Sequence, residues 1–397
     1  MTGFSKRSGS VKFWIHNPFY LFGYALIFAF IGIQFTWSSF FRAPSFQSII
    51  IILAIIFVVF GLGILFAMLS QKVITKSVIR NVAVKDRYAL FLFYILSSLE
   101  FLYSGVPIFE GGRYMEFGIP LLHVFNYGLA FYIMAFSVLL VSLSGSRQVS
   151  RFAYVSIISV VIFALLILSR HLIVMCVLYA TLVYISVQRL SFSSVLMLLI
   201  VGFLFVYGFG VLGSIRVSLL LDIPYEDAEN YILSAGGASD TFRATGLPVS
   251  FFWGWLYLCS PLYNFIYNVD NIELLGRSGI GIGDFLISEV IPETFSKRIF
   301  ENFDLTQYKA LLVVDWLTVG TAFSGPYYHL GLGGVFLLLG VLSILTTATH
   351  LLIRVKFNRL CFTFFASTVF SLLVFDNLLP MPPFIVAVIL FILRPRE

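Results

Sequence analysis

The sequence predicts an all-α polytopic membrane protein with about ten transmembrane helices, cytoplasmic termini and one large loop on the opposite side. Of its 397 residues, 60% are apolar and 11% are charged, and the mean hydropathy is +0.99. Soluble domains carry roughly a quarter of charged residues. The apolar residues also form runs of about 17–25, the length that a helix needs to cross a hydrocarbon core. Because these runs are continuous rather than alternating, they do not predict a transmembrane barrel.

Ten apolar runs predict ten spanning helices. The first run is too long for a cleavable signal peptide and has no small-residue cleavage site, so we expect it to remain as a signal anchor. Cys176, Cys259 and Cys361 are far apart and show no metal-ligand spacing, so we expect neither a metal nor a cofactor. The predicted helices cover residues 18–37, 47–69, 88–103, 123–143, 152–168, 172–187, 192–212, 326–349, 360–375 and 383–393.

The charges at the helix ends predict the orientation. With the N-terminus inside, the cytoplasmic segments hold 16 of the 25 Lys and Arg residues. The short loops on the opposite side hold three, Arg42, Arg113 and Arg170. Since cytoplasmic loops are enriched in Lys and Arg, we expect both termini to be cytoplasmic. The basic residues form no single patch, so the net charge of +6 does not indicate nucleic-acid binding.

Residues 213–325 are the polar exception, and they divide the chain into 1–212, 213–325 and 326–397. This segment holds 13 of the 19 acidic residues. Within it, residues 247–267 are apolar and aromatic. A single crossing there would reverse the charge bias, so we expect an interfacial or re-entrant helix that is broken near Pro261. If residues 311–323 also crossed, there would be twelve spanning helices and Asp315 would be buried.

The basic residues of the outer side are mostly arginines, whose planar guanidinium binds phosphate through two hydrogen bonds. Arg170 lies between two apolar runs, where a charge is costly and usually functional. Arg216 closely follows the seventh run. We expect these two residues to act in catalysis on a phosphate-bearing head group, and Arg243 and Arg277 to bind substrate. Ion pairing with nearby carboxylates, or snorkelling in the case of Arg170, remains the alternative.

Residues 105–122 form a second informative stretch on the outer side. Glu110, Arg113 and Glu116 are interleaved there with aromatic residues such as Tyr114. Sugar rings stack on aromatic faces, and their hydroxyls bond to carboxylates. The composition therefore predicts a sugar-binding loop, although a plain interfacial loop would look the same.

The start of the eighth run and the start of the long segment supply candidate bases. His329, preceded by Tyr327 and Tyr328, could take up a proton or contact phosphate, and a structural role is the alternative. Asp222 is the carboxylate that we expect to be catalytic. Further candidate bases are Glu226, Asp227 and Asp315.

Together these stretches resemble the O-antigen polymerase (Wzy) family of oligosaccharide repeat-unit polymerases. Arg243 and Gly254 fit an Arg-x10-Gly spacing that the family carries in its periplasmic loops. A Ser169–Arg170 pair ends a helix, and residues 253–263 form an aromatic stretch. The other matching segments are GVPIF at 105–109, YMEFGIPLLHVF at 114–125 and VGTAFSGPYYHLGLGG at 319–334.

The resemblance implies a glycosyltransferase at the periplasmic face of the bacterial inner membrane. It would polymerise undecaprenyl-diphosphate-linked oligosaccharide repeat units into O-antigen or a similar polysaccharide, as a step of lipopolysaccharide biosynthesis. The implied partners are that lipid-linked oligosaccharide, membrane lipid and a chain-length regulator protein. Two alternatives are an O-antigen ligase of related architecture and a flippase or secondary transporter. The chain shows no internal repeat of the kind common in transporters.

Overall fold

The computed structural model of the chain describes residues 16–70, 82–109, 117–143, 147–187, 191–272, 281–303 and 311–393. Within these ranges the protein is helical, and its β-structure is a single bridge between Ser38 and Ala238. The all-α prediction is therefore confirmed. By length and composition five helices could cross a membrane, as expected of a membrane protein: α2 (Phe46–Ser70), α4 (Pro120–Leu143), α5 (Arg147–Leu166), α7 (Phe192–Leu221) and α14 (Leu332–Leu352).

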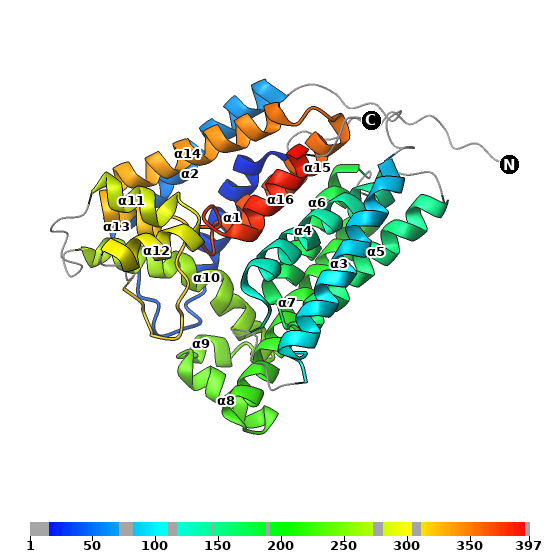
Figure 1. Ribbon diagram of the computed structural model, residues 1–397. Coiled ribbons are helices and arrows are strands. Elements are labelled where there is room, and N and C mark those ends of the chain that lie inside the picture. Colours follow the sequence, from blue (N-terminus) through cyan, green and yellow to red (C-terminus); the bar gives the residue numbers. More distant parts are fainter. Residues whose placement is uncertain are drawn as a thin grey trace.

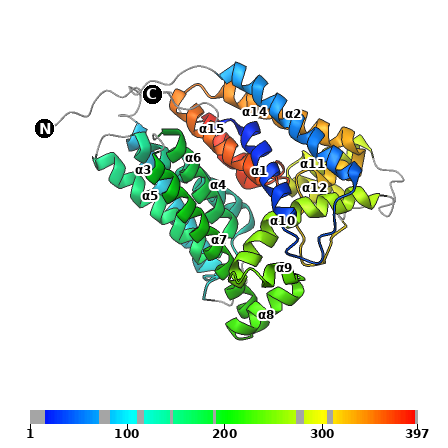
Figure 2. The same ribbon diagram turned by 180° about the vertical axis from the view of Figure 1, so that it is seen from behind.

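The helices form two groups that meet most extensively where α4 packs on α16 (Pro382–Leu393), and α10 (Val249–Asp270) lies beside this contact, packed against α7 on one side and α1 on the other (Figures 1 and 2). The first group contains α3 (Val82–Ser104), α4, α5, α6 (Arg170–Val187) and α7. The second contains α1 (Pro18–Ile33), α2, α14, α15 (Lys356–Leu372) and α16 (Pro382–Leu393). The polar segment adds α8 (Tyr225–Ala235), α9 (Asp240–Arg243), α11 (Ile282–Glu289), α12 (Glu293–Phe303) and α13 (Ser324–Leu330).

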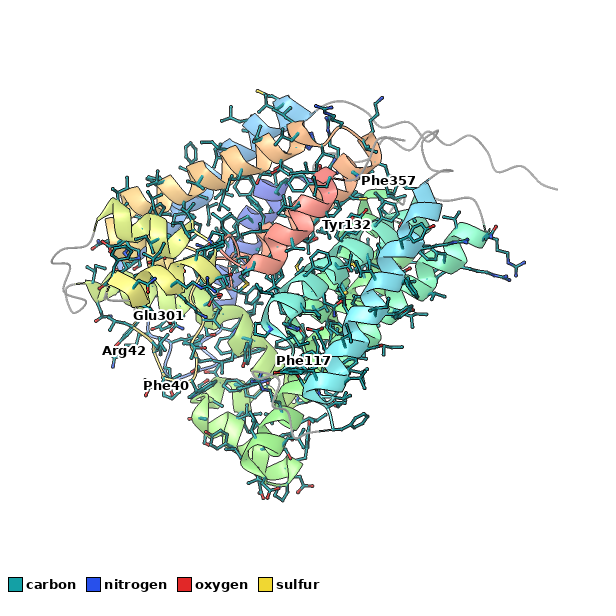
Figure 3. The ribbon with its side chains drawn as sticks, viewed as in Figure 1. Phe40, Arg42, Phe117, Tyr132, Glu301 and Phe357 are labelled. Carbon is teal, nitrogen blue, oxygen red and sulfur yellow. The ribbon has the colours of Figure 1, made fainter. Side chains whose placement is uncertain are left out.

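Aromatic packing between α4 and the last two helices joins the groups. Tyr132 of α4 packs on Phe391 of α16 with ring centroids 5.2 Å apart. Phe136 meets Phe357 of α15 edge-on at 5.0 Å. Tyr132 and Phe357 both lie in this packed region (Figure 3). Aromatic pairs of this kind add about 0.5–1.5 kcal/mol each beyond area burial, so the contact between the groups is a stable one.

Helix α7 is longer than the sequence predicts. Residues 213–221 continue it beyond the expected end at residue 212, and it ends at Asp222, a C-cap in the left-handed conformation (φ 52°). Asp and Asn adopt this conformation more readily than other non-glycine residues. The extension places Arg216 on the last turns of a helix instead of in a loop, and the boundary expected at residue 213 falls inside α7.

Helix α10 runs through Pro261 without the break that we expected. A proline inside a helix costs roughly 3 kcal/mol. Most of α10 is buried, and its packing against α1 and α7 outweighs that local cost. Two residues, Asn264 and Asn268, project from this helix to hold the chain that follows α12.

Residues 311–323 form no helix. The alternative with twelve spanning helices, which needs a second crossing there, is therefore wrong. Asn264 Nδ2 donates to the backbone oxygens of Leu317 (2.7 Å) and Val319 (2.9 Å). Asn268 Nδ2 donates to Leu311 O (2.7 Å), and its Oδ1 accepts from Leu311 N. These amides satisfy backbone groups that a helix would pair internally. The segment is therefore fixed along α10.

The predicted helix over residues 326–349 is two helices, α13 and α14, divided at Gly331. Gly331 has φ 61° and ψ −146°, a conformation available almost only to glycine. The bend lets α13 pack on α11, while α14 runs beside α2.

Candidate functional site

A cavity of about 690 Å³ lies where α6 begins, α7 ends and the connection from α15 to α16 crosses α10. Its walls also include Trp37, which follows α1, and the irregular segment around Trp316. Ligand sites in proteins typically measure about 300–1,000 Å³ and combine apolar walls with a few polar groups. This cavity is therefore the candidate functional site.

Aromatic rings make up much of the cavity wall. Trp37 and Trp255 lie with centroids 5.4 Å apart, and both line it. Trp316 lines it from the irregular segment and stacks on Trp253 of α10 at 5.6 Å and 21°. Tyr257 of α10 contributes a further ring. Flat aromatic faces of this kind suit the C–H faces of sugar rings.

Polar side chains reach the cavity from three directions. Arg216 comes from α7 and is half-buried. Asp376 comes from the connection between α15 and α16. Ser169 and His171 come from the start of α6. The cavity thus brings a permanent cation and a carboxylate together within one largely aromatic enclosure.

The turn before α6 is held by Ser169. Its Oγ accepts a hydrogen bond from Leu172 N (3.3 Å), which caps the helix, and it also hydrogen-bonds to the Tyr127 hydroxyl of α4. The preceding residue, Leu168, lines the cavity with φ 52°, a conformation that is rare for leucine. Strained backbone of this kind clusters at functional sites. Arg170 is the first residue of α6, and its side chain lies outside the described part of the chain.

Asp376 has an environment suited to proton transfer. Its side chain is exposed in the open cavity, while the protein packed around the carboxyl group partly desolvates it and raises its pKa to about 6. Two weaker influences are the backbone hydrogen bond from Asn377, which lowers this pKa, and the charge of Glu293, which raises it. A base is most effective when its pKa lies close to the working pH.

Glu289, at the end of α11, lies behind Asp376. It is 7% exposed, and burial raises its pKa to about 7. Its Oε2 accepts from Asn377 Nδ2 (2.9 Å), and its Oε1 lies 3.8 Å from His329 Nε2. Burial lowers the pKa of His329, so this histidine is largely neutral at pH 7 and supplies little positive charge to the carboxylate.

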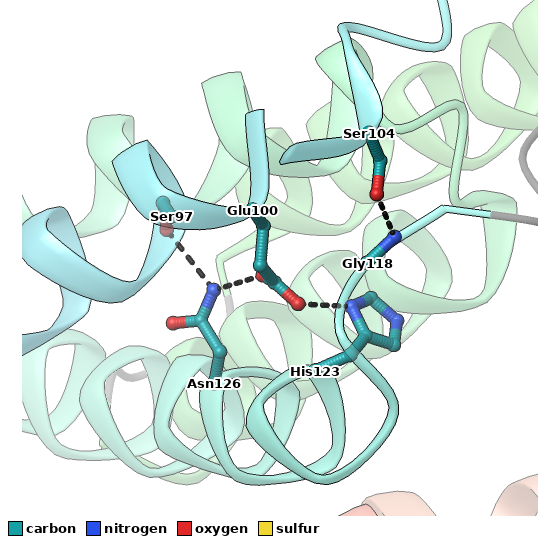
Figure 4. Close-up of polar contacts among 6 residues, drawn as sticks. All are labelled: Ser97, Glu100, Ser104, Gly118, His123 and Asn126. Atoms are coloured by element: carbon teal, nitrogen blue, oxygen red, sulfur yellow. Dashed lines mark hydrogen bonds and ion pairs between the residues drawn. The ribbon is translucent and has the colours of Figure 1, made fainter. Parts of the chain in front are cut away.

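A second buried carboxylate, Glu100, ties α3 to α4 (Figure 4). Glu100 is fully buried and accepts from Asn126 Nδ2 (2.6 Å), while its other oxygen lies 2.8 Å from His123 Nδ1. Ser97 accepts from the same Asn126 amide, and Ser104 Oγ accepts from Gly118 N. Since none of these residues lines the cavity, we assign this cluster to the anchoring of the two helices.

Of the residues singled out from the sequence, Arg216 lines the cavity. Asp222, Arg243, Tyr327, Tyr328 and His329 do not line it. Asp222 is an exposed helix cap, and exposed Arg243 donates from Nε to Ala238 O (3.4 Å). His329 and Tyr327 are buried around α13. The remaining expected site residues, Glu110, Arg113, Tyr114, Glu116 and Arg277, lie outside the described residues.

Sequence reasoning did not single out Asp376, Glu289, His171 or Trp316 as functional residues. Asp376 and Asn377 lie between two apolar runs, as Arg170 does. This position is the sequence feature that could have identified Asp376 as a candidate functional residue. Glu289 had no local signal, because its role depends on α13 and on Asn377. Among the described residues, no group of three or more His, Cys, Asp and Glu is placed to hold a metal ion.

Comparisons of the chain with known proteins identified no relative. No family model, curated protein or solved structure matches the chain.

Proposed function

We propose that the protein is a glycosyltransferase that polymerises lipid-diphosphate-linked oligosaccharide repeat units at the periplasmic face of a bacterial inner membrane. The observation that carries this proposal is the cavity of about 690 Å³ in which Arg216 and Asp376 share an aromatic enclosure. A transferase of this kind needs a cation for the departing diphosphate, flat walls for sugar rings and an acceptor for the hydroxyl proton. The sequence resemblance to oligosaccharide repeat-unit polymerases supports the same reading.

The position of the cavity along the helices also supports the proposal. The end of α7, the start of α6, the end of α15 and the start of α16 all border it. Under the proposed topology of ten spanning helices and cytoplasmic termini, each of these helix ends lies on the periplasmic side. A substrate that has already crossed the membrane on its lipid carrier would reach the cavity there.

A route for the lipid chain runs beside α7. Phe205, Val206 and Phe209 of this helix line the cavity, while the outer face of α7 is apolar and exposed over most of its length. In a bilayer that face contacts acyl chains. A polyprenyl chain lying along α7 would therefore place its diphosphate near Arg216, close to the end of the helix.

The chemistry assigned to Arg216 is stabilisation of the leaving group. Its guanidinium keeps its charge at any physiological pH and can bind two phosphate oxygens at once. Fixed cations are most effective where water is excluded and where charge develops in the transition state. Arg170, the first residue of α6, is the second arginine to which the sequence assigns this role.

Glycan analysis of a deletion strain tests the proposal. Loss of a polymerase leaves single repeat units attached to the cell-surface lipid, whereas loss of a ligase leaves none. Complementation with Arg216→Ala should leave the strain with single repeats only, while Arg298→Ala, which removes an exposed arginine of α12, should restore polymer. Both proteins must accumulate in the membrane. Normal polymer in the deletion strain would refute the proposed function, and lipid translocation without any polymer would favour a flippase.

A further inference from the structure

We infer that Asp376 is the general base of the proposed transfer and that Glu289, acting through Asn377, is the positioning residue that orients it. The inference rests on the proposed function, because it assigns roles within the same cavity. It concerns residues of the α15–α16 connection and of α11 that the resemblance to polymerases did not single out.

The position of Asp376 provides the first argument. Asp376 is the one carboxylate, among the residues that the structure describes, that lines the same cavity as Arg216. A donor whose diphosphate lies at Arg216 would have its first sugar in the aromatic part of the cavity, between Trp255 and Trp316. An acceptor hydroxyl that attacks this sugar within the cavity would have the carboxyl group of Asp376 within the same enclosure.

The hydrogen bonds around Asn377 provide the second argument. The Asn377 N–H donates to Asp376 Oδ1 (2.7 Å), and Leu379 N donates to Asn377 Oδ1 (3.2 Å). The Asn377 amide also donates to both the backbone oxygen (3.0 Å) and the carboxyl Oε2 (2.9 Å) of Glu289. Every polar atom of the Asn377 side chain is thus engaged in fixing the connection on which Asp376 stands.

The burial of Glu289 provides the third argument. A methyl group at Gly325 would lie 1.9 Å from Glu289 Oε1, so α13 closes directly over the carboxyl group. Burying a carboxyl group costs free energy unless it is well paired. His329, 3.8 Å away, is kept largely neutral by burial, so Asn377 is the principal partner of Glu289. We attribute the burial of Glu289 to its role in holding Asn377, and through Asn377 the connection that carries Asp376.

The acceptor hydroxyl oxygen forms a bond to the anomeric carbon of the donor sugar, and its proton passes to the Asp376 carboxylate. The bond from that carbon to the diphosphate oxygen breaks, and the lipid diphosphate leaves with the bonding electron pair. Arg216 compensates the charge that develops on the leaving oxygen.

This role predicts a pH dependence. Asp376 accepts a proton only when ionised, so the transfer rate should fall as the pH drops through about 6. Replacing Glu293 with glutamine removes a negative charge that raises the pKa of Asp376, so the fall should move to lower pH. The other charged or titratable groups around this site are Arg216 on α7, His171 on α6, Glu289 and Asp284 on α11, and His329 on α13.

Azide provides the decisive test, because this anion attacks the sugar without losing a proton. The assay uses purified full-length protein in lipid nanodiscs, with undecaprenyl-diphosphate-linked repeat units extracted from the deletion strain. Asp376→Asn should lower the polymerisation rate roughly 10²–10⁴-fold, and azide should restore release of lipid diphosphate together with a glycosyl azide. Arg216→Ala should not respond to azide. Polymerisation by Asp376→Asn within twofold of the parent rate, or no azide rescue of this variant, would overturn the inference.

Glu289 is tested by comparing two replacements. Glu289→Ala removes the side-chain acceptor for the Asn377 amide, leaves the backbone acceptor in place, and should lower kcat about tenfold with little change in KM. Glu289→Gln retains an acceptor oxygen and should recover most of the activity. Glu301→Gln, on the exposed face of α12, is the matched control and should match the parent. Equal losses in the alanine and glutamine variants, or a loss confined to KM, would contradict the positioning role.

Failure of the proposed function and failure of the base assignment give different results. If the deletion strain makes normal polymer, the proposed function is wrong whatever the variants do. If the deletion strain loses polymer while Asp376→Asn restores it fully, the function stands and the assignment of the base is wrong.

Discussion

Replacing Gly210 with alanine tests the contact between α7 and α10 on which the cavity depends. A Cβ atom at Gly210 would lie 2.0 Å from the Ser250 backbone oxygen and 2.6 Å from its carbonyl carbon. Ordinary contacts between carbon and oxygen are about 3.3–3.6 Å. Since a backbone oxygen cannot rotate away, α7 must move outward by more than 1 Å, roughly the difference between these distances.

Gly208 is the matched control, two residues earlier on the same helix. A Cβ atom there would meet no atom within 4 Å. Replacing a helical glycine with alanine gains about 1 kcal/mol when space is available. Overpacking costs about 1–3 kcal/mol. Because the gain from replacing a helical glycine is common to both variants, they should differ in stability by the overpacking cost of roughly 1–3 kcal/mol, with Gly208→Ala equal to the parent or more stable.

Thermal unfolding of both variants in the same detergent measures this difference. Because α7 also carries Phe209 and Arg216 into the cavity, Gly210→Ala should lower the proposed transferase activity at temperatures where the variant is still folded. Equal unfolding midpoints for Gly208→Ala and Gly210→Ala would refute the close approach of the two helices.

Three further predictions concern the buried polar groups. The free energy of unfolding should decline as the pH rises from 4.5 to about 7. The reason is that burial raises the pKa of Glu289 to about 7, so the folded protein favours the protonated form of this residue. Glu289→Gln should abolish up to roughly 3 kcal/mol of that decline. Glu100→Ala should destabilise the protein by about 3–5 kcal/mol, because Asn126 and His123 lose a buried partner. Asn264→Ala should release the segment that carries Trp316, which would expose residues 311–319 to proteases and weaken binding of the proposed sugar donor.

Chemical unfolding at several pH values checks the first two of these predictions, with Glu301→Gln as the exposed control. A pH dependence that is unchanged in the glutamine variant would show that Glu289 does not titrate between those values. Limited proteolysis checks the third prediction, and a cleavage pattern identical to that of the parent would contradict it.

The sequence predicted the helical framework because apolar run length depends on local composition. It failed where a single residue or a distant contact decides the outcome. Gly331 divides a continuous apolar run through its backbone conformation, and hydropathy does not report backbone conformation. The packing of α10 against α1 and α7 keeps it helical through Pro261, although a local rule predicts a break there.

The sequence could predict a residue of the candidate site only where a chemically suitable side chain lies next to the end of an apolar run. Arg216 was identified because it follows an apolar run on the outer side, and it does line the cavity. Glu289 and Asp376 are 87 residues apart in numbering, and the hydrogen bonds of Asn377 connect them only in the folded chain. Thirteen acidic residues in the polar segment offered no means of choosing the buried one.

The location of the cavity follows from how the two helix groups meet. Where α4 packs on α15 and α16, aromatic side chains from the facing helices are in direct contact. Farther along, α10 lies between α7 and α1, and the short α15–α16 connection, a bridge between two helices of the second group, lines the cavity there. A bridge of this kind cannot pair its backbone within a helix, so it requires polar side chains such as Asn377. The structural need that places Asn377 and Glu289 there also supplies the rigid support that a reactive Asp376 requires.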